Sequence, residues 1–153
     1  MLSYLKSFFP LLLVFLLAHP AFSQQTDPMT TGILSFRSGN YSDAVSQFEK
    51  ALSADPNNAE AHLLLARLFW ETDLRDSKRA TKEIQAALLI EPNNVQYLVA
   101  SLQQFREDAA FFFTDKTRAR LRRDLAKKII VLDETNSFAH EELGKTYIRD
   151  FWR

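Results

Sequence analysis

The sequence predicts an all-helical fold in which helical hairpins stack into a solenoid. The chain has 153 residues, of which 46% are apolar and only 3 are glycine, too few for a turn-rich β fold. Its apolar residues recur at the spacing of an α-helix. The ending Asp-Pro-Asn-Asn at 55–58 returns as Glu-Pro-Asn-Asn at 91–94. A helix ending that repeats at a fixed distance predicts a repeated structural unit.

The first 23 residues predict a cleaved secretory signal. Lys6 precedes an apolar run over 8–18 that only Pro10 interrupts, and the small-x-small triplet 21–23 follows. This pattern predicts cleavage after Ser23, leaving residues 24–153 as one repeat domain. About 11 apolar residues cover half of the ~20 that a membrane-spanning helix needs, which favours a signal over an anchor. We therefore expect a periplasmic or secreted chain with no stable membrane span, and since it has no Cys, packing alone must stabilise it.

Two aligned segments predict helices with one apolar face and a defined end. The first has apolar residues at spacings of 0, 4, 7 and 8, which share a helix face: Ala44, Phe48, Ala51 and Leu52. The second has Ala80, Ile84, Ala87 and Leu88. A proline ends each helix, because it cannot continue the hydrogen-bond ladder and restricts the residue before it.

An amphipathic segment precedes each of these helices, so the unit is a hairpin. Gly32 aligns with Ala66 and Phe36 with Trp70 at a shift of 34 residues, whereas the helix endings align at a shift of 36. The second hairpin should therefore carry two extra residues in its turn, where insertions are tolerated. Small residues at 32 or 66 and at 44 or 80 should let the paired helices approach closely.

These residues resemble the tetratricopeptide repeat family, whose unit is a helix-turn-helix of ~34 residues. The first unit matches at Gly32, Gly39, Tyr41, Ala44, Phe48, Ala51, Leu52, Asp55 and Pro56, although its Trp, Leu and Tyr slots hold Pro28, Thr31 and Ser35. The second unit matches at Leu65, Ala66, Phe69, Ala80, Ile84, Ala87, Leu88 and Pro92. Leu143, Gly144 and Tyr147 begin a fourth unit. The resemblance implies a right-handed solenoid of about three and a half units, at about 25–58, 59–94, 95–136 and a partial 137–153.

The third of these units departs from the family pattern. It ends in Leu132-Asp133 with Glu134 where proline is usual, and it is about eight residues too long for a repeat of ~34. Three consecutive phenylalanines, Phe111, Phe112 and Phe113, precede Thr114-Asp115, a predicted helix cap. Neighbouring residues on a helix point in different directions. The three rings could form a satellite cluster under the inter-helix loop or a patch that docks a partner.

Residues 116–128 form a basic run with seven basic residues and one acidic one, a local net charge of +6. Leu121, Leu125, Ile129 and Leu132 recur through it at helical spacing, which predicts a core stripe on an otherwise solvated helix. A surface for acidic partners or nucleic acid is the alternative. The whole chain balances 19 basic against 19 acidic residues, and no aromatic residues alternate with this run, so we expect no nucleic-acid partner.

No pattern predicts catalysis, a metal or a cofactor. Beyond the predicted signal only His62 and His140 remain, and both fall on the same slot early in a first helix. A single His without further ligands at helical spacing is not a metal site, so both are predicted to pack. There is no Gly-rich phosphate loop, no Cys and no Gly-x-Ser-x-Gly turn. We expect a non-enzymatic chain.

The resemblance implies a binding groove for a protein or peptide, lined by the first helix of each unit. The groove positions are Met29, Ile33 and Arg37 in the first unit, Leu63, Arg67 and Trp70 in the second, Gln96, Val99 and Gln103 in the third, and Glu141 and Lys145 in the fourth. Some family members bind the carboxyl terminus of chaperones through a clamp of Lys, Asn and Arg. The corresponding positions here are Met29, Ile33, Leu64, Gln96 and Ala100, none of which matches, so that function is not implied.

Two hypotheses for function follow. In the first, the chain is an exported scaffold that binds a partner in the groove. In the second, it is the N-terminal repeat region of a longer exported protein, because the partial fourth unit leaves apolar residues such as Tyr147 and Ile148 uncovered, where a terminal repeat should be polar. The chain resembles exported bacterial proteins with such repeats ahead of a domain that carries a Gly-Trp-x-Thr-Asp motif, which is absent here. Self-association through this last helix is a further possible outcome.

Overall fold

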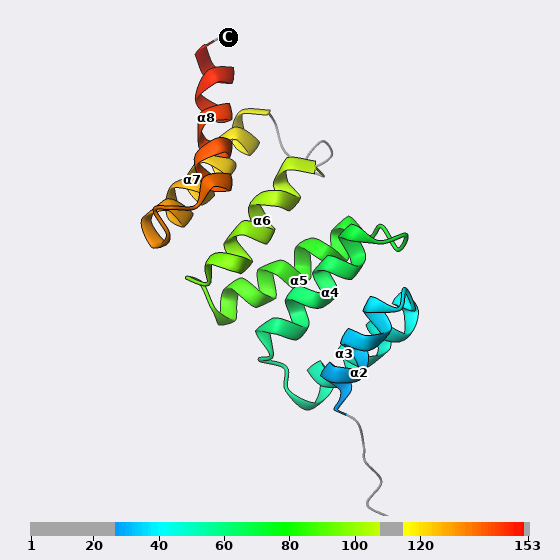
Figure 1. Ribbon diagram of the computed structural model, residues 1–153. Helices are drawn as coiled ribbons and strands as arrows, with labels where there is room; N and C mark the ends of the chain where they lie inside the picture. Colours follow the sequence, from blue (N-terminus) through cyan, green and yellow to red (C-terminus); the bar gives the residue numbers. More distant parts are fainter. Residues whose placement is uncertain (1–26, 108–114, 152–153) are drawn as a thin grey trace, which may run out of the picture.

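The structure, a computed structural model, describes residues 27–107 and 115–151. In this part of the chain it contains helices and no strand: α2 (Pro28–Arg37), α3 (Tyr41–Ala54), α4 (Ala59–Glu71), α5 (Ser77–Ile90), α6 (Val95–Glu107), α7 (Asp115–Leu132) and α8 (Ser137–Phe151) (Figure 1). The predicted signal at 1–23 and the predictions for Phe111, Phe112 and Phe113 lie outside the described residues. None of the described helices is both long enough and apolar enough to cross a membrane.

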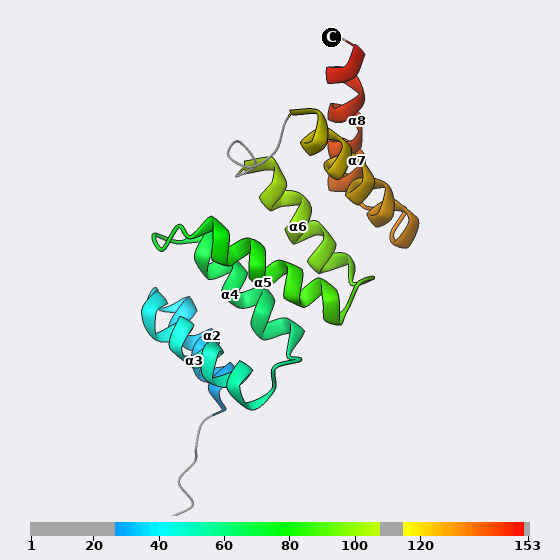
Figure 2. The same ribbon diagram turned by 180° about the vertical axis from the view of Figure 1, so that it is seen from behind.

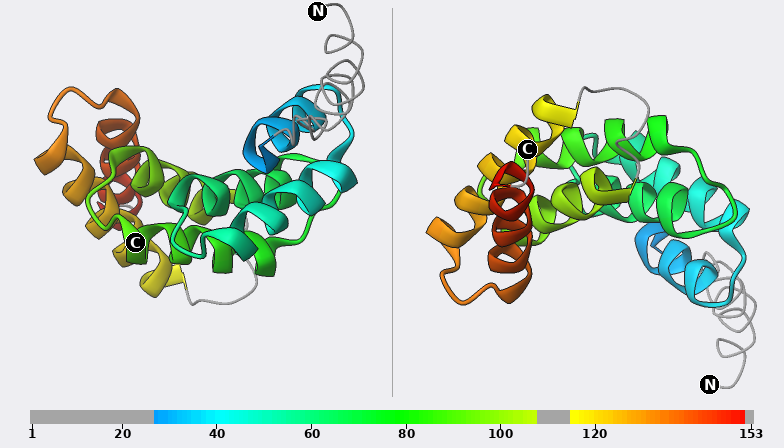
Figure 3. Two further views of the ribbon diagram at one scale, coloured as in Figure 1. Left: turned by 90° about the horizontal axis from the view of Figure 1, so that it is seen from below. Right: turned by 90° about the horizontal axis from the view of Figure 1, so that it is seen from above.

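The helices pack in chain order, each against its neighbours in sequence. The closest packing occurs within the hairpins α2–α3 and α4–α5, which stack side by side in both views of Figures 1 and 2. Seen along the stack, the helices follow an arc, with α2 and α8 on its inner side and α3 and α7 on its outer side (Figure 3). The predicted helical-hairpin solenoid is thus the observed architecture.

The turns between units share one geometry that explains where each helix begins and ends. The backbone N–H groups of Asn58, Asn94 and Asn136 donate to the carbonyls of Asp55, Glu91 and Asp133, each at 3.2 Å. The side chains of Asn58 and Asn136 then accept from the N–H three residues on, at 2.9 and 3.1 Å, as N-cap residues do. The third unit therefore closes at the predicted place even though Glu134 replaces proline.

The turns inside the hairpins differ in length as predicted. Residues 38–40 join α2 to α3, and residues 72–76 join α4 to α5, so the second turn is two residues longer. Asp76 ends the longer turn and caps α5 by accepting from the N–H of Arg79 at 3.0 Å. Gly39 has a φ of 78°, a left-handed conformation that glycine adopts without steric cost.

Small residues form the seams of the first two hairpins, as predicted. Ala44 and Ala80 are both completely buried. At Gly32 a Cβ atom would lie 2.6 Å from the ring of Phe48, so the glycine is required by the close approach of α3. Phe48 and Ala44 belong to one core cluster, while a second cluster, around Leu102 and Ile129, holds α6, α7 and α8 together.

The predicted core stripe of α7 is displaced. Of the four stripe residues only Ile129 is buried, and Leu132 is 42% exposed. The buried positions are instead Ala119, Arg122, Ala126 and Ile129. The reason is that α7 packs more extensively against α8 than against α6, which turns a different face inward. The charged residues around the stripe were predicted to be solvated, and that prediction was wrong at Arg122, which is buried.

Candidate binding surface

The predicted groove residues divide into two groups by exposure. Five side chains are exposed, and they carry most of the charge: Arg37, Arg67, Gln96, Glu141 and Lys145. The others are partly buried: Met29, Ile33, Leu63, Trp70, Val99 and Gln103. Several of the second group also contact the core, since Met29, Ile33 and Trp70 pack against the first core cluster and Val99 packs against the second. The groove prediction itself stays a prediction.

Arg67 is the centre of a cation–aromatic cluster on two first helices. Its Nε and Nη2 donate to Oε1 and Oε2 of Glu71, at 3.0 and 3.1 Å, which fixes the guanidinium in one orientation. The guanidinium carbon lies 5.9 Å from the centre of the Phe36 ring on α2, within cation–π range. The Arg67 side chain remains 44% exposed, so it stays accessible to a partner.

Phe36 and Trp70 give this cluster its apolar part. Both rings are partly buried and pack against the first core cluster, and the Phe36 ring also meets Tyr41 at a centroid distance of 6.0 Å. Phe36 was not among the predicted groove residues, although its alignment with Trp70 marked the same helix position. We call Phe36, Arg67 and Trp70 the aromatic–arginine cluster.

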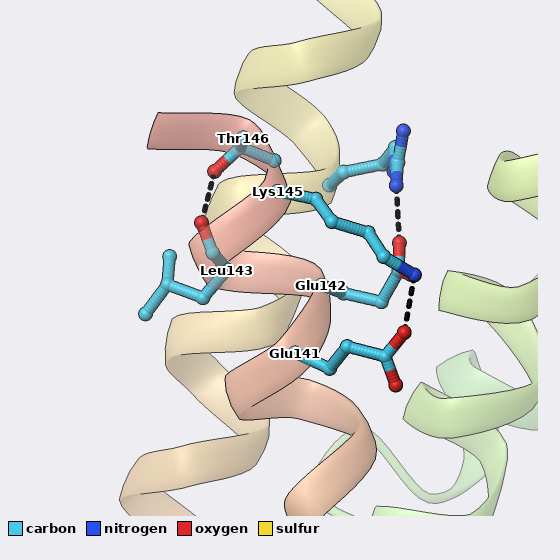
Figure 4. A network of polar contacts seen from close by, with 6 residues as sticks. Glu141, Glu142, Leu143, Lys145 and Thr146 are labelled. Carbon is cyan, nitrogen blue, oxygen red and sulfur yellow. Dashed lines mark hydrogen bonds and ion pairs between the residues drawn. The ribbon is translucent and has the colours of Figure 1, made fainter. Parts of the chain in front are cut away.

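A buried ion pair joins α7 to α8 at the other end of the chain. The Arg122 guanidinium donates to Glu142, whose side chain is fully buried. Lys145 reaches the same carboxylate at 3.0 Å and also pairs with Glu141; the three α8 residues project from one side of the helix (Figure 4). Burial, the largest influence, raises the pKa of the Glu142 carboxyl, but the hydrogen bonds and charges of Arg122 and Lys145 outweigh it and the pKa is lowered.

Sequence reasoning missed the pairing of Arg122 with Glu142. Lys145 and Glu141, which extend this ion pair into a network, were predicted only as groove positions. Neither Arg122 nor Glu142 was predicted to be buried. The signal was present in the alignment of Asp133 with Glu91, which places Arg122 at the seam slot of Ala80. A buried slot that holds an arginine requires a nearby counter-charge.

The two histidines make equivalent contacts rather than a shared site. His62 Nε2 lies 3.2 Å from the carbonyl of Pro56, and His140 Nε2 lies 2.9 Å from that of Glu134. His62 Nδ1 also contacts Glu83 on α5 at 2.6 Å. His62 is partly buried, in keeping with the predicted packing role, but His140 is exposed, so for His140 that prediction was wrong. Within 27–107 and 115–151, no cluster of three His, Cys, Asp or Glu residues could hold a metal.

Comparison with known proteins shows which repeat this fold is similar to. Residues 35–102 match the family model of the tetratricopeptide repeat. The fold is a tetratricopeptide repeat solenoid. It is similar to the first such domain of Spaghetti (RPAP3), bound to the HSP90 peptide SRMEEVD, with a TM-score of 0.63, 16% identity, and coverage of 80% of this chain and 91% of that one.

Two other solved structures align over a similar share of the chain. The second domain of human RPAP3, in complex with the HSP70 peptide SGPTIEEVD, has a TM-score of 0.61 and 17% identity over 79% of this chain and 92% of that one. MamA has a TM-score of 0.66 and 21% identity over 81% of this chain and 62% of its own length. Among curated proteins, none matches the chain.

Four of the five positions of the chaperone-peptide clamp carry apolar side chains here, and the fifth holds the exposed Gln96. Met29, Ile33 and Leu64 contact the first core cluster, and Ala100 is 9% exposed. None of these four side chains can donate a hydrogen bond to a carboxylate. Similarity to the domains that bind chaperone peptides therefore extends to the fold and not to those residues.

Proposed function

We propose that this tetratricopeptide repeat chain is a non-catalytic scaffold in an exported compartment of a bacterium, and that it binds a protein or peptide partner along the first helices of its units. The solenoid fold is typical of interaction scaffolds. Two of the similar structures contain bound peptides. The predicted groove residues supply exposed charge on α2, α4 and α8, and the exposed amide of Gln96 on α6.

The aromatic–arginine cluster carries this proposal. Binding hot spots favour Arg and aromatic side chains that are already held in place. Arg67 is held by Glu71 and lies over Phe36, yet nearly half of its side chain remains exposed. Leu63 and Trp70, at spacings of four and three residues, lie on the same side of α4. A partner would gain apolar contact and a fixed donor group at one place.

The test is to substitute this cluster once a partner has been identified by pull-down with the mature chain. Arg67→Ala combined with Trp70→Ala should weaken binding by at least about 2 kcal/mol, measured by calorimetry. Since Trp70 also contacts the core, the single variant Arg67→Ala keeps the test valid if the double variant unfolds. An exposed ion pair contributes only about 0 to 1 kcal/mol to folding, so Arg67→Ala should fold normally and still bind more weakly.

Arg79 offers a matched control on a second helix. It forms an ion pair with Glu49 at 2.5 Å and lies 4.1 Å from the centre of the Phe69 ring, with 46% of its side chain exposed. Arg79→Ala therefore removes the same kinds of contact from α5 instead of α4. We expect it to leave partner affinity unchanged. If Arg67→Ala and Arg79→Ala weaken binding equally, or if neither does, the groove is not the binding surface.

Export rests on the pattern of the first 23 residues, with Lys6, the apolar run and the small residues Ala21 and Ser23 at the recognition slots. Expression of the full chain in a Gram-negative host should yield a periplasmic product that begins at Gln24. N-terminal sequencing of that product measures the cleavage site. A full-length product in the membrane fraction would contradict the proposal.

A further inference from the structure

Helices α3, α5 and α7 end in the same way, which brings their exposed faces into register. In each, the N–H of the residue that follows the helix donates to the carbonyl four residues before it, at 2.9, 2.9 and 2.7 Å. Four exposed positions of each helix, at spacings of 0, 4, 7 and 11 residues, share one side of that helix. We call these sets the outer rows: Ser42, Ser46, Glu49 and Ser53 on α3; Lys78, Lys82, Gln85 and Leu89 on α5; Arg120, Asp124, Lys127 and Val131 on α7.

The outer rows differ between the first unit and the two that follow. The row of α3 is polar throughout and ends in Ser53. The rows of α5 and α7 contain basic residues and end in an aliphatic one. Leu89 is 85% exposed and Val131 is 84% exposed, so both side chains protrude from the surface. The fold does not require an aliphatic residue at this position, because serine occupies it in α3.

The aliphatic ends of these two rows lie on one surface. Lys128 on α7 extends to the end of α5, where its Nζ donates to the carbonyl of Pro92 at 2.6 Å. Pro92 follows Leu89 by three residues, and Lys128 precedes Val131 by three. Leu132, which is 42% exposed, is next to Val131 in sequence. We call the following residues the outer patch: Lys82, Leu89, Lys127, Lys128, Val131 and Leu132.

Positive charge is concentrated on the same two helices. Residues 77–90 and 119–132 together contain eight basic residues and two acidic ones, although the whole chain is balanced. Both carboxylates already have partners, since Glu83 contacts His62 at 2.6 Å and Asp124 lies 3.8 Å from Arg120. The lysines therefore give the outer patch an excess of positive charge around its protruding aliphatic side chains.

The outer patch lies in the middle of the stack of helices. Helix α5 packs against α4 and α6, and α7 packs against α6 and α8. Units of a solenoid contact only their neighbours in sequence, so an additional unit at either end of the stack would pack on an outermost helix. Such a unit would leave the outer patch exposed. Its aliphatic residues are thus not positions that the repeat fold itself covers.

We propose that the outer patch binds the surface of an anionic phospholipid bilayer. Its lysines lie at the headgroup phosphates, and Leu89 and Val131 enter the boundary between headgroups and acyl chains. Basic residues near an anionic leaflet and apolar side chains in that boundary each contribute to such binding. A protein partner would need a preformed pocket for each protruding side chain, whereas lipids rearrange around them. Helix α7 is also on the outer side of the arc of helices (Figure 3), where a bilayer can approach it.

This surface is separate from the aromatic–arginine cluster. The cluster lies on the first helices α2 and α4, whereas the outer patch lies on the second helices α5 and α7. The proposal therefore goes beyond the groove proposed above, and either one can fail without the other.

The test is sedimentation of residues 24–153, which contain all the described helices, with two kinds of vesicle. One contains phosphatidylglycerol and phosphatidylcholine in equal amounts, and the other contains phosphatidylcholine alone. We expect binding to the anionic vesicles and at least about tenfold weaker binding to the neutral ones, because the attraction of the lysines is then lost. Raising the ionic strength from about 0.1 M to about 1 M shortens the Debye length from ~10 Å to ~3 Å and should release most of the bound chain.

Two double variants separate the charge from the insertion. Lys82→Gln with Lys127→Gln should weaken binding by at least about tenfold, since each lysine near an anionic surface contributes about fivefold. Leu89→Ser with Val131→Ser introduces the residue that α3 has at this position and should weaken binding by at least about threefold. All four side chains are exposed, so both variants should unfold at the same urea concentration as the parent.

Lys50→Glu is the matched control. It lowers the net charge by two, as the double lysine variant does, but at an exposed position of α3 outside the outer patch. Its affinity for the anionic vesicles should fall by less than about threefold, because the charge lies away from the bound surface. A control that loses as much as the double lysine variant overturns the proposal, since net charge and not the patch would then cause binding.

Two further outcomes overturn the proposal. The first is the absence of binding to the anionic vesicles. The second is a Leu89→Ser, Val131→Ser variant that binds these vesicles as tightly as the parent. In that case the aliphatic residues do not enter the bilayer, and an acidic protein is the better occupant of the outer patch.

Discussion

The first two hairpins and the third unit differ at one repeated position in the second helix of each unit, which we call the seam slot. In α3 and α5 the slot holds Ala44 and Ala80, both completely buried, and each helix packs closely on the helix before it. In α7 the slot holds Arg122, which is 8% exposed. This helix packs more extensively on the helix after it, α8, than on α6.

The difference shows what a single slot can decide in a repeat. Alanine has no polar group and little volume, so two helices can approach at that point and bury their neighbours. A guanidinium needs both space and a counter-charge when it is buried. Glu142 on α8 supplies the counter-charge, while the slot that corresponds to Glu142 on α6 holds Ala100. The ion pair thus links α7 to α8 and leaves the third hairpin less closely packed.

The largest expected effect comes from removing half of the buried ion pair. Glu142→Gln leaves the Arg122 charge buried without a counter-charge and should reduce the free energy of unfolding by about 3 to 5 kcal/mol, measured by urea denaturation. The double variant Arg122→Met with Glu142→Leu restores an apolar seam, as in the first two hairpins. We expect the free energy of unfolding of this double variant to equal that of the parent or to exceed it by about 1 to 4 kcal/mol. A double variant as unstable as Glu142→Gln would mean that the pair is needed for packing.

The two helix glycines extend the comparison to the first helices. Gly32→Ala places a Cβ 2.6 Å from the buried Phe48 ring and should cost about 1 to 3 kcal/mol in unfolding free energy. Gly144→Ala meets open space and should gain up to about 1 kcal/mol, because alanine favours the helix. Thermal and urea denaturation of the two variants measure the difference. Equal effects of the two substitutions would show that Gly144 is as closely packed in solution as Gly32.

Ala44→Leu tests the small seam of the first hairpin directly. The longer side chain has no space in the completely buried slot and should cost about 1 to 3 kcal/mol. Ala54→Leu, at the exposed end of the same helix, is the control and should change stability by less than about 0.5 kcal/mol. A neutral Ala44→Leu in urea denaturation would contradict the tight seam.

The smallest expected effect is a pH dependence that comes from the ion pair between α7 and α8. The pKa of Glu142 is lower in the folded chain than its ordinary value of 4.5, so the unfolded chain binds the proton more tightly. Its contribution to stability is present above pH 4.5 and is lost as the pH falls through the folded-state pKa. Urea denaturation at a series of pH values should therefore show that the Arg122→Met, Glu142→Leu variant loses less stability than the parent as the pH falls. If the two stability profiles superimpose, Glu142 does not contribute to the pH dependence of folding.

Much of the fold could be predicted because the deciding signals are local. Pro56 and Pro92 predicted where their helices end, and the two extra residues in the second turn followed from counting. The caps at Asn58 and Asn136 are equally local, although the sequence analysis did not name them. The seam residues Ala44 and Ala80 and the buried Phe48 and Ile84 also followed, because a helix face is a property of spacing alone. The groove residues were placed only by resemblance, and their exposure now separates charged candidates such as Arg67 from packed ones such as Met29.

The sequence by itself determined where the helices lie and which slots repeat, since caps, prolines and apolar periodicity act within a few residues. Only the tertiary structure decided which face of α7 is buried. Helix α7 packs on both α6 and α8, and the burial of Arg122 depends on Glu142, which lies 20 residues further along the chain. The tertiary structure also decided that Phe36 joins Arg67 across two units and that Gly144 faces open space where Gly32 meets a ring. Each of these outcomes depends on how helices from different units come together, and spacing within one helix carries no information on that.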